Sequence, residues 1–283
     1  MSIPDQFFSY ILHLCYNIYM PRFKKIIDDG KNKIVFLGTG GARFTMIKQI
    51  RATAGIWMNI FDTKIYMDPG PGALVWARKR DISLENLDGI IVSHKHLDHS
   101  GDINVMIEAM TNGGRKKRGI VIAPYDALSG DPVILNYLRE YPQKINILKE
   151  YNEYKVKNFK FSTGKRLYHD KERKIENYGI KFTYNNKIIS FLTDTKFKED
   201  IVESYKGDIM ILNVLLEESK EHIFHLSIQD VYKIIEIAHP EKVILTHFGT
   251  TLLFKNLIAL SKEISDKTNT DIKAAYDGME LIL

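Results

Sequence analysis

Cysteine is nearly absent from this chain of 283 residues, which has only Cys15, and proline is scarce at eight residues. A single cysteine excludes an internal disulfide framework and a zinc module built from cysteines, and it favours a reducing, cytoplasmic setting. The apolar fraction of 45% and the charged fraction of 27% exclude a disordered or collagen-like chain. No linker rich in proline, glycine or serine interrupts the chain, so we expect one large domain.

The chain also lacks a strong excess of charge of either sign. Forty Lys and Arg residues against 35 Asp and Glu residues give a net charge of +5. This small excess suits an anionic substrate without requiring nucleic acid. A run of four basic residues, Arg115 to Arg118, is either a solvated loop or a patch that steers the phosphates of RNA or DNA.

A hydrophobic run long enough to span a bilayer is missing as well. Residues 7–20 are apolar and aromatic, but His13 and Asn17 interrupt them, and a span needs roughly 20 apolar residues. The features of a cleaved signal peptide are not found. We therefore expect residues 1–32 to form a helical extension that docks on the domain or on a second copy in a homodimer, without stable membrane insertion.

Residues 33–283 carry the patterning of a globular α/β domain. Short apolar strands are expected at 34–37, 56–60, 65–67 and 89–92, and again at 119–123 and 145–148 with a helix between them. Hairpins are expected between residues 154 and 192, with a turn at Asn185-Asn186. Helices are expected over 72–80, 103–110, 229–238 and 252–264. Two mixed sheets with helices outside would accommodate this order as four layers.

The densest group of chemically active side chains follows the apolar strand at residues 89–92. Three histidines and an aspartate fall within six residues: His94, His96, Asp98 and His99. On an extended backbone, residues two apart point to the same side, so His94 and His96 can share a ligand. Imidazole nitrogen and carboxylate oxygen suit zinc, iron or manganese. A histidine-rich surface turn is the alternative interpretation.

This H-x-H-x-D-H motif resembles the metal-binding motif of the metallo-β-lactamase-fold hydrolases, and four more family positions follow the expected order. Asp68 corresponds to the family's structural aspartate beneath the site. The family's ligand positions correspond here to His94, His96 and His169 for a first metal, to Asp98, His99 and His247 for a second, and to Asp194 as the bridge between them. The resemblance implies a four-layer αβ/βα sandwich over residues 33–283.

It also implies two divalent metal ions, with zinc expected and manganese or iron as alternatives. Two such cations, the aspartates Asp98 and Asp194 and a bridging hydroxide leave a net charge of +1, which suits a phosphodiester monoanion. In this interpretation the hydroxide attacks phosphorus, and Asp98 is a catalytic residue as well as a ligand.

A further histidine, His225, precedes Ser227, a suitable helix N-cap. The segment resembles the phosphodiesterase branch of the family, which includes tRNA 3′-processing endonucleases and cyclic-phosphate diesterases. That resemblance implies that His225 stabilises or protonates the leaving oxygen as a general acid. A surface histidine at a helix start is the alternative, and His222 is a rival for the role. His13 and His239 are expected to be structural or exposed.

The spacing of the motifs narrows the choice within the family. Only 25 residues separate His169 from Asp194, which leaves no room for the long arm of the tRNA 3′ endonucleases. Hydrolysis of a smaller phosphodiester is therefore favoured, and an RNA 3′-processing nuclease stays an alternative. A thioester or lactone hydrolase of the glyoxalase II type is the other enzymatic alternative. A metal-stabilised scaffold that binds RNA or a partner is the non-enzymatic one.

The glycine-rich segment Gly38 to Arg43 is not a nucleotide-binding motif. Arg43 occupies the third glycine position of a dinucleotide fingerprint, and the Gly-Lys-Ser/Thr ending of a P-loop is missing. The loop either passes close to the metal site or makes a simple tight turn.

Overall fold

The computed structural model describes residues 23–172 and 174–283. The helix expected over residues 7–20, and any dimer contact it makes, lie outside these residues. The described part of the expected extension, residues 23–32, contains no helix. It lies against the domain through Ile26, which is buried and donates its N–H to the Arg80 carbonyl at 2.8 Å. Among the described helices, none combines the length and the apolar character needed to cross a bilayer.

The first sheet has seven strands in the order β15-β1-β2-β3-β4-β5-β6 within the described residues. Its strands are β1 (Lys33–Phe36), β2 (Ile56–Ile60), β3 (Thr63–Met67), β4 (Gly89–Ile91), β5 (Ile120–Ala123), β6 (Lys144–Ile147) and β15 (Met279–Ile282). Strands β3 to β6 run parallel, and the other pairs are antiparallel. The helices of this half are α2 (Ala42–Lys48), α3 (Ala73–Lys79), α4 (Leu97–Ser100) and α5 (Ile103–Thr111).

The second sheet has the order β14-β13-β11-β10-β9-β8-β7, and β12 pairs with β11. Its strands are β7 (Glu153–Val156), β8 (Phe159–Ser162), β9 (Ile180–Tyr184), β10 (Lys187–Leu192), β11 (Ile209–Leu216), β12 (Leu226–Ser227), β13 (Lys242–Thr246) and β14 (Asp271–Ala274). Strands β10, β11, β13 and β14 run parallel. The helices here are α6 (Glu199–Ser204), α7 (Ile228–Ala238), α8 (Thr250–Leu253) and α9 (Leu257–Thr268).

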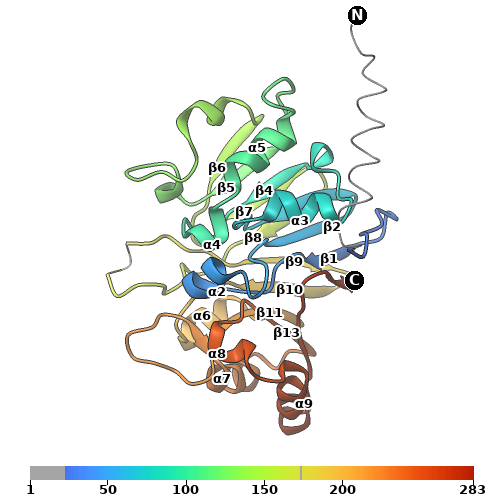
Figure 1. The fold of residues 1–283 in the computed structure, drawn as a ribbon. Coiled ribbons are helices and arrows are strands. Elements are labelled where there is room, and N and C mark those ends of the chain that lie inside the picture. Colours follow the sequence, from blue (N-terminus) through green and yellow to red (C-terminus); the bar gives the residue numbers. More distant parts are fainter. Residues whose placement is uncertain (1–22, 173) are drawn as a thin grey trace, which may run out of the picture.

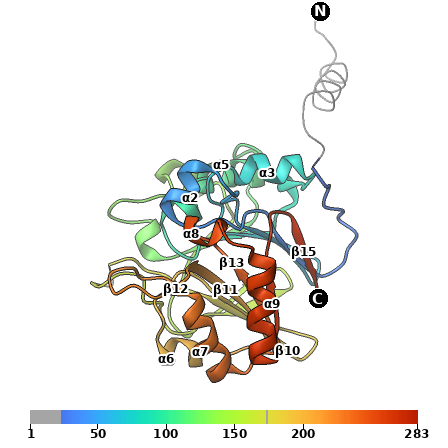
Figure 2. The ribbon, with the colours of Figure 1, turned by 60° about the horizontal axis from the view of Figure 1, so that its bottom comes forward.

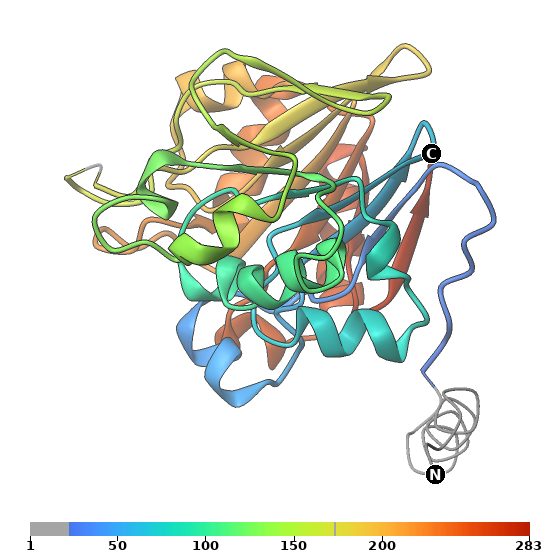
Figure 3. The same ribbon diagram turned by 90° about the horizontal axis from the view of Figure 1, so that it is seen from above.

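The two sheets pack face to face, and each carries helices on its outer side. Figures 1 and 2 show α3 and α5 on one outer side and α6, α7 and α9 on the other, with the strands between them. In Figure 3 α3 and α5 lie in front of the strands. Strand β1 illustrates this layering, because successive side chains of a strand point to opposite faces of the sheet. Ile34 and Phe36 belong to the core between the two sheets, whereas Val35 belongs to the core under the helices. This arrangement confirms the expected fold class.

Most expected elements are present, but three details differ. The helix expected between β5 and β6 is replaced by two short 3₁₀ helices, Tyr125–Ala127 and Asn136–Glu140. The helix expected over residues 252–264 is divided into α8 and α9, because the Asn256 side chain accepts a hydrogen bond from the Ala259 N–H at 3.1 Å and starts a new helix. Helices α2, α4 and α6 were not expected from the sequence.

Candidate metal centre

All seven candidate metal ligands follow the carboxyl ends of strands, and these ends meet at one edge of the two sheets. The first sheet contributes the segment after β4, and the second contributes segments after β8, β10 and β13. In chain order the ligands are His94 and His96 after β4, Asp98 and His99 on α4, His169 after β8, Asp194 after β10 and His247 after β13. The structure therefore brings together residues that are spread over more than 150 positions of the chain.

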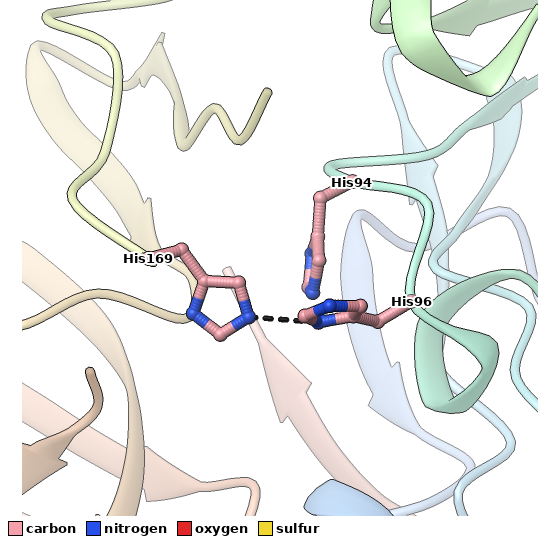
Figure 4. Close-up of side chains that lie close together, drawn as sticks. All are labelled: His94, His96 and His169. Carbon is pink, nitrogen blue, oxygen red and sulfur yellow. Dashed lines mark hydrogen bonds between the residues drawn. The ribbon is translucent and has the colours of Figure 1, made fainter. Parts of the chain in front are cut away.

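Three histidines form the first group (Figure 4). His169 Nε2 lies 2.8 Å from His96 Nδ1, and the ring of His94 lies 4.9 Å from that of His96 and 4.8 Å from that of His169. His94 and His169 are buried, whereas His96 is exposed. Their nitrogens are close enough together to hold one metal ion.

The second group consists of Asp98, His99, Asp194 and His247. His247 Nε2 lies 3.0 Å from His99 Nε2, 3.2 Å from an Asp98 oxygen and 3.3 Å from Asp194 Oδ1. The other Asp194 oxygen lies 3.8 Å from His94 Nε2. Asp194 thus reaches both groups of ligands, which is the placement that a bridging carboxylate needs.

The outer nitrogens of two histidines are held by a hydrogen-bond chain that ends at Asp68. Ser93 donates its hydroxyl to Asp68 Oδ2 at 2.8 Å, so Ser93 Oγ accepts from His94 Nδ1 at 3.0 Å. His99 Nδ1 donates to the same carboxylate at 2.9 Å. Both rings therefore turn Nε2 toward the site, and such outer partners orient metal ligands. Asp68 has the structural role expected from the sequence, whereas Ser93 was missed.

Two of the candidate ligands that follow strands of the second sheet, His169 and Asp194, are also held by hydrogen bonds. His169 Nδ1 donates to the Phe224 carbonyl at 3.2 Å, which turns His169 Nε2 toward the site. The Asn213 side chain donates to Asp194 Oδ1 at 2.9 Å. Asn213 was not predicted, although a polar side chain inside the apolar strand β11 is a signal that could have identified it.

The donor set fits a metal centre. The Nε2 atom of His94 is buried and has no hydrogen-bond partner in the described part of the chain. A buried lone pair without a partner is costly, and a metal ion would satisfy it. Histidine nitrogens and carboxylate oxygens in two adjoining groups match the ligands of divalent transition metals.

The histidines of the first group are electrically neutral at neutral pH. Burial lowers the pKa of His94, that of His169 and that of His96, the last to about 4. Neutral imidazole is the form that binds metals.

The second group gathers carboxylates around a histidine. Burial lowers the pKa of His99, but Asp194, Asp98 and Asp68 outweigh it and hold that pKa above its usual value. Burial raises the pKa of Asp194, but His247 and His99 outweigh it and keep the carboxylate ionised. Without a metal, a proton on His99 partly balances the negative charge, and a metal cation can replace it.

The glycine-rich loop after β1 passes directly against the second group. A Cβ atom on Gly41 would lie 2.1 Å from His247 Nδ1, and the Ala42 N–H donates to Asp98 Oδ2 at 2.7 Å. Gly41 has an extended φ of −138°, so glycine is needed here for space and not for its backbone freedom. His247 itself has a φ of +62°, a conformation that costs free energy in a non-glycine residue.

His225 lies beside the centre, at the start of β12 and α7. Its Nδ1 atom lies 3.6 Å from Asp194 Oδ2 and has no hydrogen-bond partner in the described residues. Burial lowers the pKa of His225 to about 3. Its rival His222 is exposed at the rim of the same cavity, and His239 is the exposed C-cap of α7.

A cavity of about 730 Å³ opens beside the candidate ligands. Its described lining is Ala42, Arg43, Phe44, Met46, His96, Leu97, Asp98, Asp194, Leu215, His222, Ile223 and His225. Both metal groups and His225 therefore face one space that can hold a substrate.

The basic run from Arg115 to Arg118 lies elsewhere. It precedes β5, and the start of β5 pairs with Gly89 at the start of β4, whereas the metal ligands follow the other end of β4. Arg118 donates to the Leu87 carbonyl at 3.0 Å. The run thus lies at the opposite edge of the sheet from the centre, and Arg118 has a local structural role.

Comparison with known proteins identifies the family. Residues 63–248, about two thirds of the chain, match the family model described as "Beta-lactamase superfamily domain". The chain belongs to this family, so it shares the metallo-β-lactamase fold of a hydrolase family. This confirms the family predicted from the motifs.

Three relatives illustrate the range of similarity. The chain is 26% identical over 258 residues to MJ1374, an uncharacterized protein of Methanocaldococcus jannaschii, covering 89% of this chain and 95% of that protein. It is 31% identical over 120 residues to ribonuclease Z of Clostridium perfringens, covering 41% of this chain and only 36% of the enzyme. The crystal structure of the metallo-β-lactamase-fold protein YhfI of Bacillus subtilis superimposes with a TM-score of 0.70 at 17% identity, covering 89% of this chain and 99% of YhfI.

Proposed function

We propose that the protein is a phosphodiesterase that depends on two divalent metal ions, with zinc as the expected metal. The observation that carries this proposal is the placement of His225, which lies 3.6 Å from the carboxylate that reaches both ligand groups. His225 is close enough to His169 and Asp194 to share a metal with them, but in this proposal those two residues belong to the two ligand sets and His225 stays free to act on the substrate. Similarity to a ribonuclease over 41% of the chain supports a phosphodiester substrate. His94, His96 and His169 would hold one ion, Asp98, His99 and His247 the other, and Asp194 would contact both. Such ions lower the pKa of a water nucleophile and neutralise phosphoryl oxygens.

The protein's own residues have three tasks in this reaction. Asp68 fixes the ring of His99 directly and that of His94 through Ser93, so that the site needs little rearrangement when substrate binds. Asp98 is held by the Ala42 N–H and His247 and stays ionised. The ligands and His225 line one cavity, which would hold the phosphodiester between them.

His225 acts on the leaving oxygen. Its lowered pKa makes the ring neutral in the free enzyme, and a neutral imidazole donates one N–H hydrogen bond. An anionic phosphodiester beside the ring raises this pKa, because negative charge favours the protonated form. The ring then stabilises or protonates the oxygen that leaves, which is worth typically 10²–10⁴-fold in rate.

Replacement of His225 by alanine tests this role. The His225→Ala variant is expected to keep the metal content of the wild type, because His225 is not among the proposed ligands. Its turnover of a 2′,3′-cyclic nucleotide should fall by about 10²-fold or more. The loss should be much smaller on bis-p-nitrophenyl phosphate, since p-nitrophenolate barely needs a proton.

His222→Ala is the matched control, because His222 lines the same cavity but is exposed. Equal losses on both substrates in His225→Ala, or a larger loss in His222→Ala, would contradict the assignment. If S-lactoylglutathione is cleaved at least as well as every phosphodiester, the function is that of a thioester hydrolase instead.

A further inference from the structure

The cavity beside the metal centre has two chemically different parts. One part is formed by the candidate ligands and His225. The other is apolar, and its side chains come from α2, α4 and the segments around β11 and β12: Phe44, Met46, Leu97, Leu215 and Ile223. A ligand that fills this cavity must therefore be polar at one end and apolar at the other.

Two of these apolar side chains are largely exposed within the described part of the chain. Phe44 on α2 is 65% exposed, and Leu97 on α4 is 60% exposed. Single exposed apolar side chains are ordinary, but these two line the same cavity as the catalytic groups. Leu97 also stands between the ligands His96 and Asp98, so a group that covers it is already next to the metal centre.

Arg43 adds a positive charge to the same lining. No carboxylate within the described parts of the chain pairs with its guanidinium, and the side chain is exposed. It is therefore available to the negative charge of a phosphodiester held at the ligands.

We propose, on the basis of the function proposed above, that the substrates are phosphodiesters whose non-leaving substituent is aromatic, and that Phe44 determines this preference. The leaving oxygen lies beside His225, so the substituent that stays on phosphorus occupies the remaining lining, against Phe44 and Leu97. An aromatic ring there removes apolar surface of both partners from water and can stack on the Phe44 ring. A phenyl group or the face of a nucleobase has this chemistry.

A pair of esters with one leaving group tests the preference. Phenyl p-nitrophenyl phosphate and methyl p-nitrophenyl phosphate both release p-nitrophenolate, so they differ only in the group that stays. For the metal-loaded wild type, we expect kcat/KM for the phenyl ester to exceed that for the methyl ester by about tenfold or more, the scale of a filled apolar pocket. Phe44→Ala should reduce this ratio about tenfold, and Phe44→Leu, which keeps an apolar side chain, should restore part of it.

Phe254→Ala is the control, because Phe254 is 83% exposed but does not line the cavity; it should keep the wild-type ratio. Equal kcat/KM values for the two esters, or a ratio unchanged by Phe44→Ala, would overturn the proposal while leaving the phosphodiesterase function standing. Failure to cleave either ester, with S-lactoylglutathione cleaved by the same preparation, would overturn both. A long single-stranded RNA cleaved more efficiently than either ester, with no effect of Phe44→Ala, would assign the substrate class to RNA instead.

Discussion

In His94 and His99, the two ring nitrogens have different roles. His94 and His99 face the site through Nε2, and their Nδ1 atoms are held by Ser93 and Asp68. Asp68 is the common end of both hydrogen-bond chains and also accepts from the Ser93 N–H at 2.6 Å. One carboxylate thus sets the orientation of a ligand in each metal group.

Replacing Asp68 by asparagine should therefore weaken metal binding without removing a ligand. In the wild type the Ser93 hydroxyl and His99 Nδ1 both donate to Asp68 Oδ2, and the Ser93 N–H donates to Oδ1. The amide has one acceptor oxygen and an NH₂ group in place of the other, so at least one of these donors loses its acceptor. We expect metal affinity to fall by about 10–100-fold, the usual effect of losing such an outer partner. Competition with a chromophoric chelator measures this.

Asp88→Asn is the matched control, because Asp88 accepts the Lys64 N–H at 2.9 Å next to the other end of β4. It should bind metal as the wild type does. Unchanged affinity in Asp68→Asn would show that the ligand rings are held by packing alone.

The sequence predicted that the seven proposed ligands gather at one site, as they do, but it did not predict most of the residues that orient them. His94 to His99 lie close together in a motif whose residue types match metal chemistry. Ser93 is an ordinary residue type at a position without a spacing rule. Asn213 stands out as a polar side chain inside the apolar strand β11, but the sequence does not show which ligand it contacts. Gly41 is required only because the fold brings His247, more than 200 residues away, within 2.1 Å of the place of its missing Cβ.

At the scale of elements, the start of α7 positions His225. Ser227 caps this helix: its hydroxyl accepts the Asp230 N–H at 3.3 Å, and Asp230 accepts the Ser227 N–H at 3.0 Å. This reciprocal pair fixes the direction in which the chain enters the helix. His225 lies two residues before the cap, so the capping box also limits where its ring can lie.

Ser227→Ala should consequently lower both stability and turnover. Loss of an N-cap costs about 1 kcal/mol of unfolding free energy, which lowers the Tm by about 2–4 °C in a domain of this size. Turnover of a poor leaving group should fall as well, because the position of His225 is less well defined.

Asn256→Ala removes the cap of α9 instead. It should lower the Tm to a similar extent and leave turnover unchanged. Equal turnover in the two variants would show that the cap does not position His225.

The elements that the sequence did not predict depend on local features that hydrophobic periodicity does not show. Helix α2 leaves Phe44 and Ile47 exposed and buries Thr45, so it lacks the alternation of apolar and polar faces that identifies a helix packed on a core. The break between α8 and α9 depends on the local hydrogen bond of Asn256, which competes with helix continuation in a way that periodicity does not show. The strands were predicted well, because their short apolar runs are distinct in the sequence; β1, β2 and β4 are buried on both faces.

At the scale of the whole molecule, the metal centre joins the two halves of the sandwich. His94 to His99 follow a strand of the first sheet, whereas His169, Asp194 and His247 follow strands of the second. Binding of metal ions stabilises the folded chain, because the unfolded chain has no preformed site. Removal of metal should therefore lower the Tm of the entire domain and not of one half.

The pH dependence of this stabilisation follows from the histidines. His96 and His225 have pKa values of about 4 and about 3 in the folded, metal-free chain, against 6.5 for an unperturbed histidine. Between pH 6.5 and 4 the unfolded chain therefore binds more protons than the folded one. The stability that the two neutral histidines contribute is fully present above pH 6.5 and is lost as the pH falls. The raised pKa of His99 does not offset this loss. The stability that His99 contributes is already fully present at pH 6.5 and does not change as the pH falls further.

Two melting series, one with zinc and one with a chelator, should separate the effects of protons and metal. The chelated protein should lose Tm steadily from pH 6.5 to 4.5. The zinc-loaded protein should melt several degrees higher at pH 7.5, and this advantage should shrink toward pH 4.5, because protons compete with the metal for the histidine nitrogens. In His96→Asn the chelated protein should lose less Tm over the same range. A zinc-dependent increase in Tm that is the same at pH 7.5 and 4.5 would mean that the ion is held by groups other than these histidines.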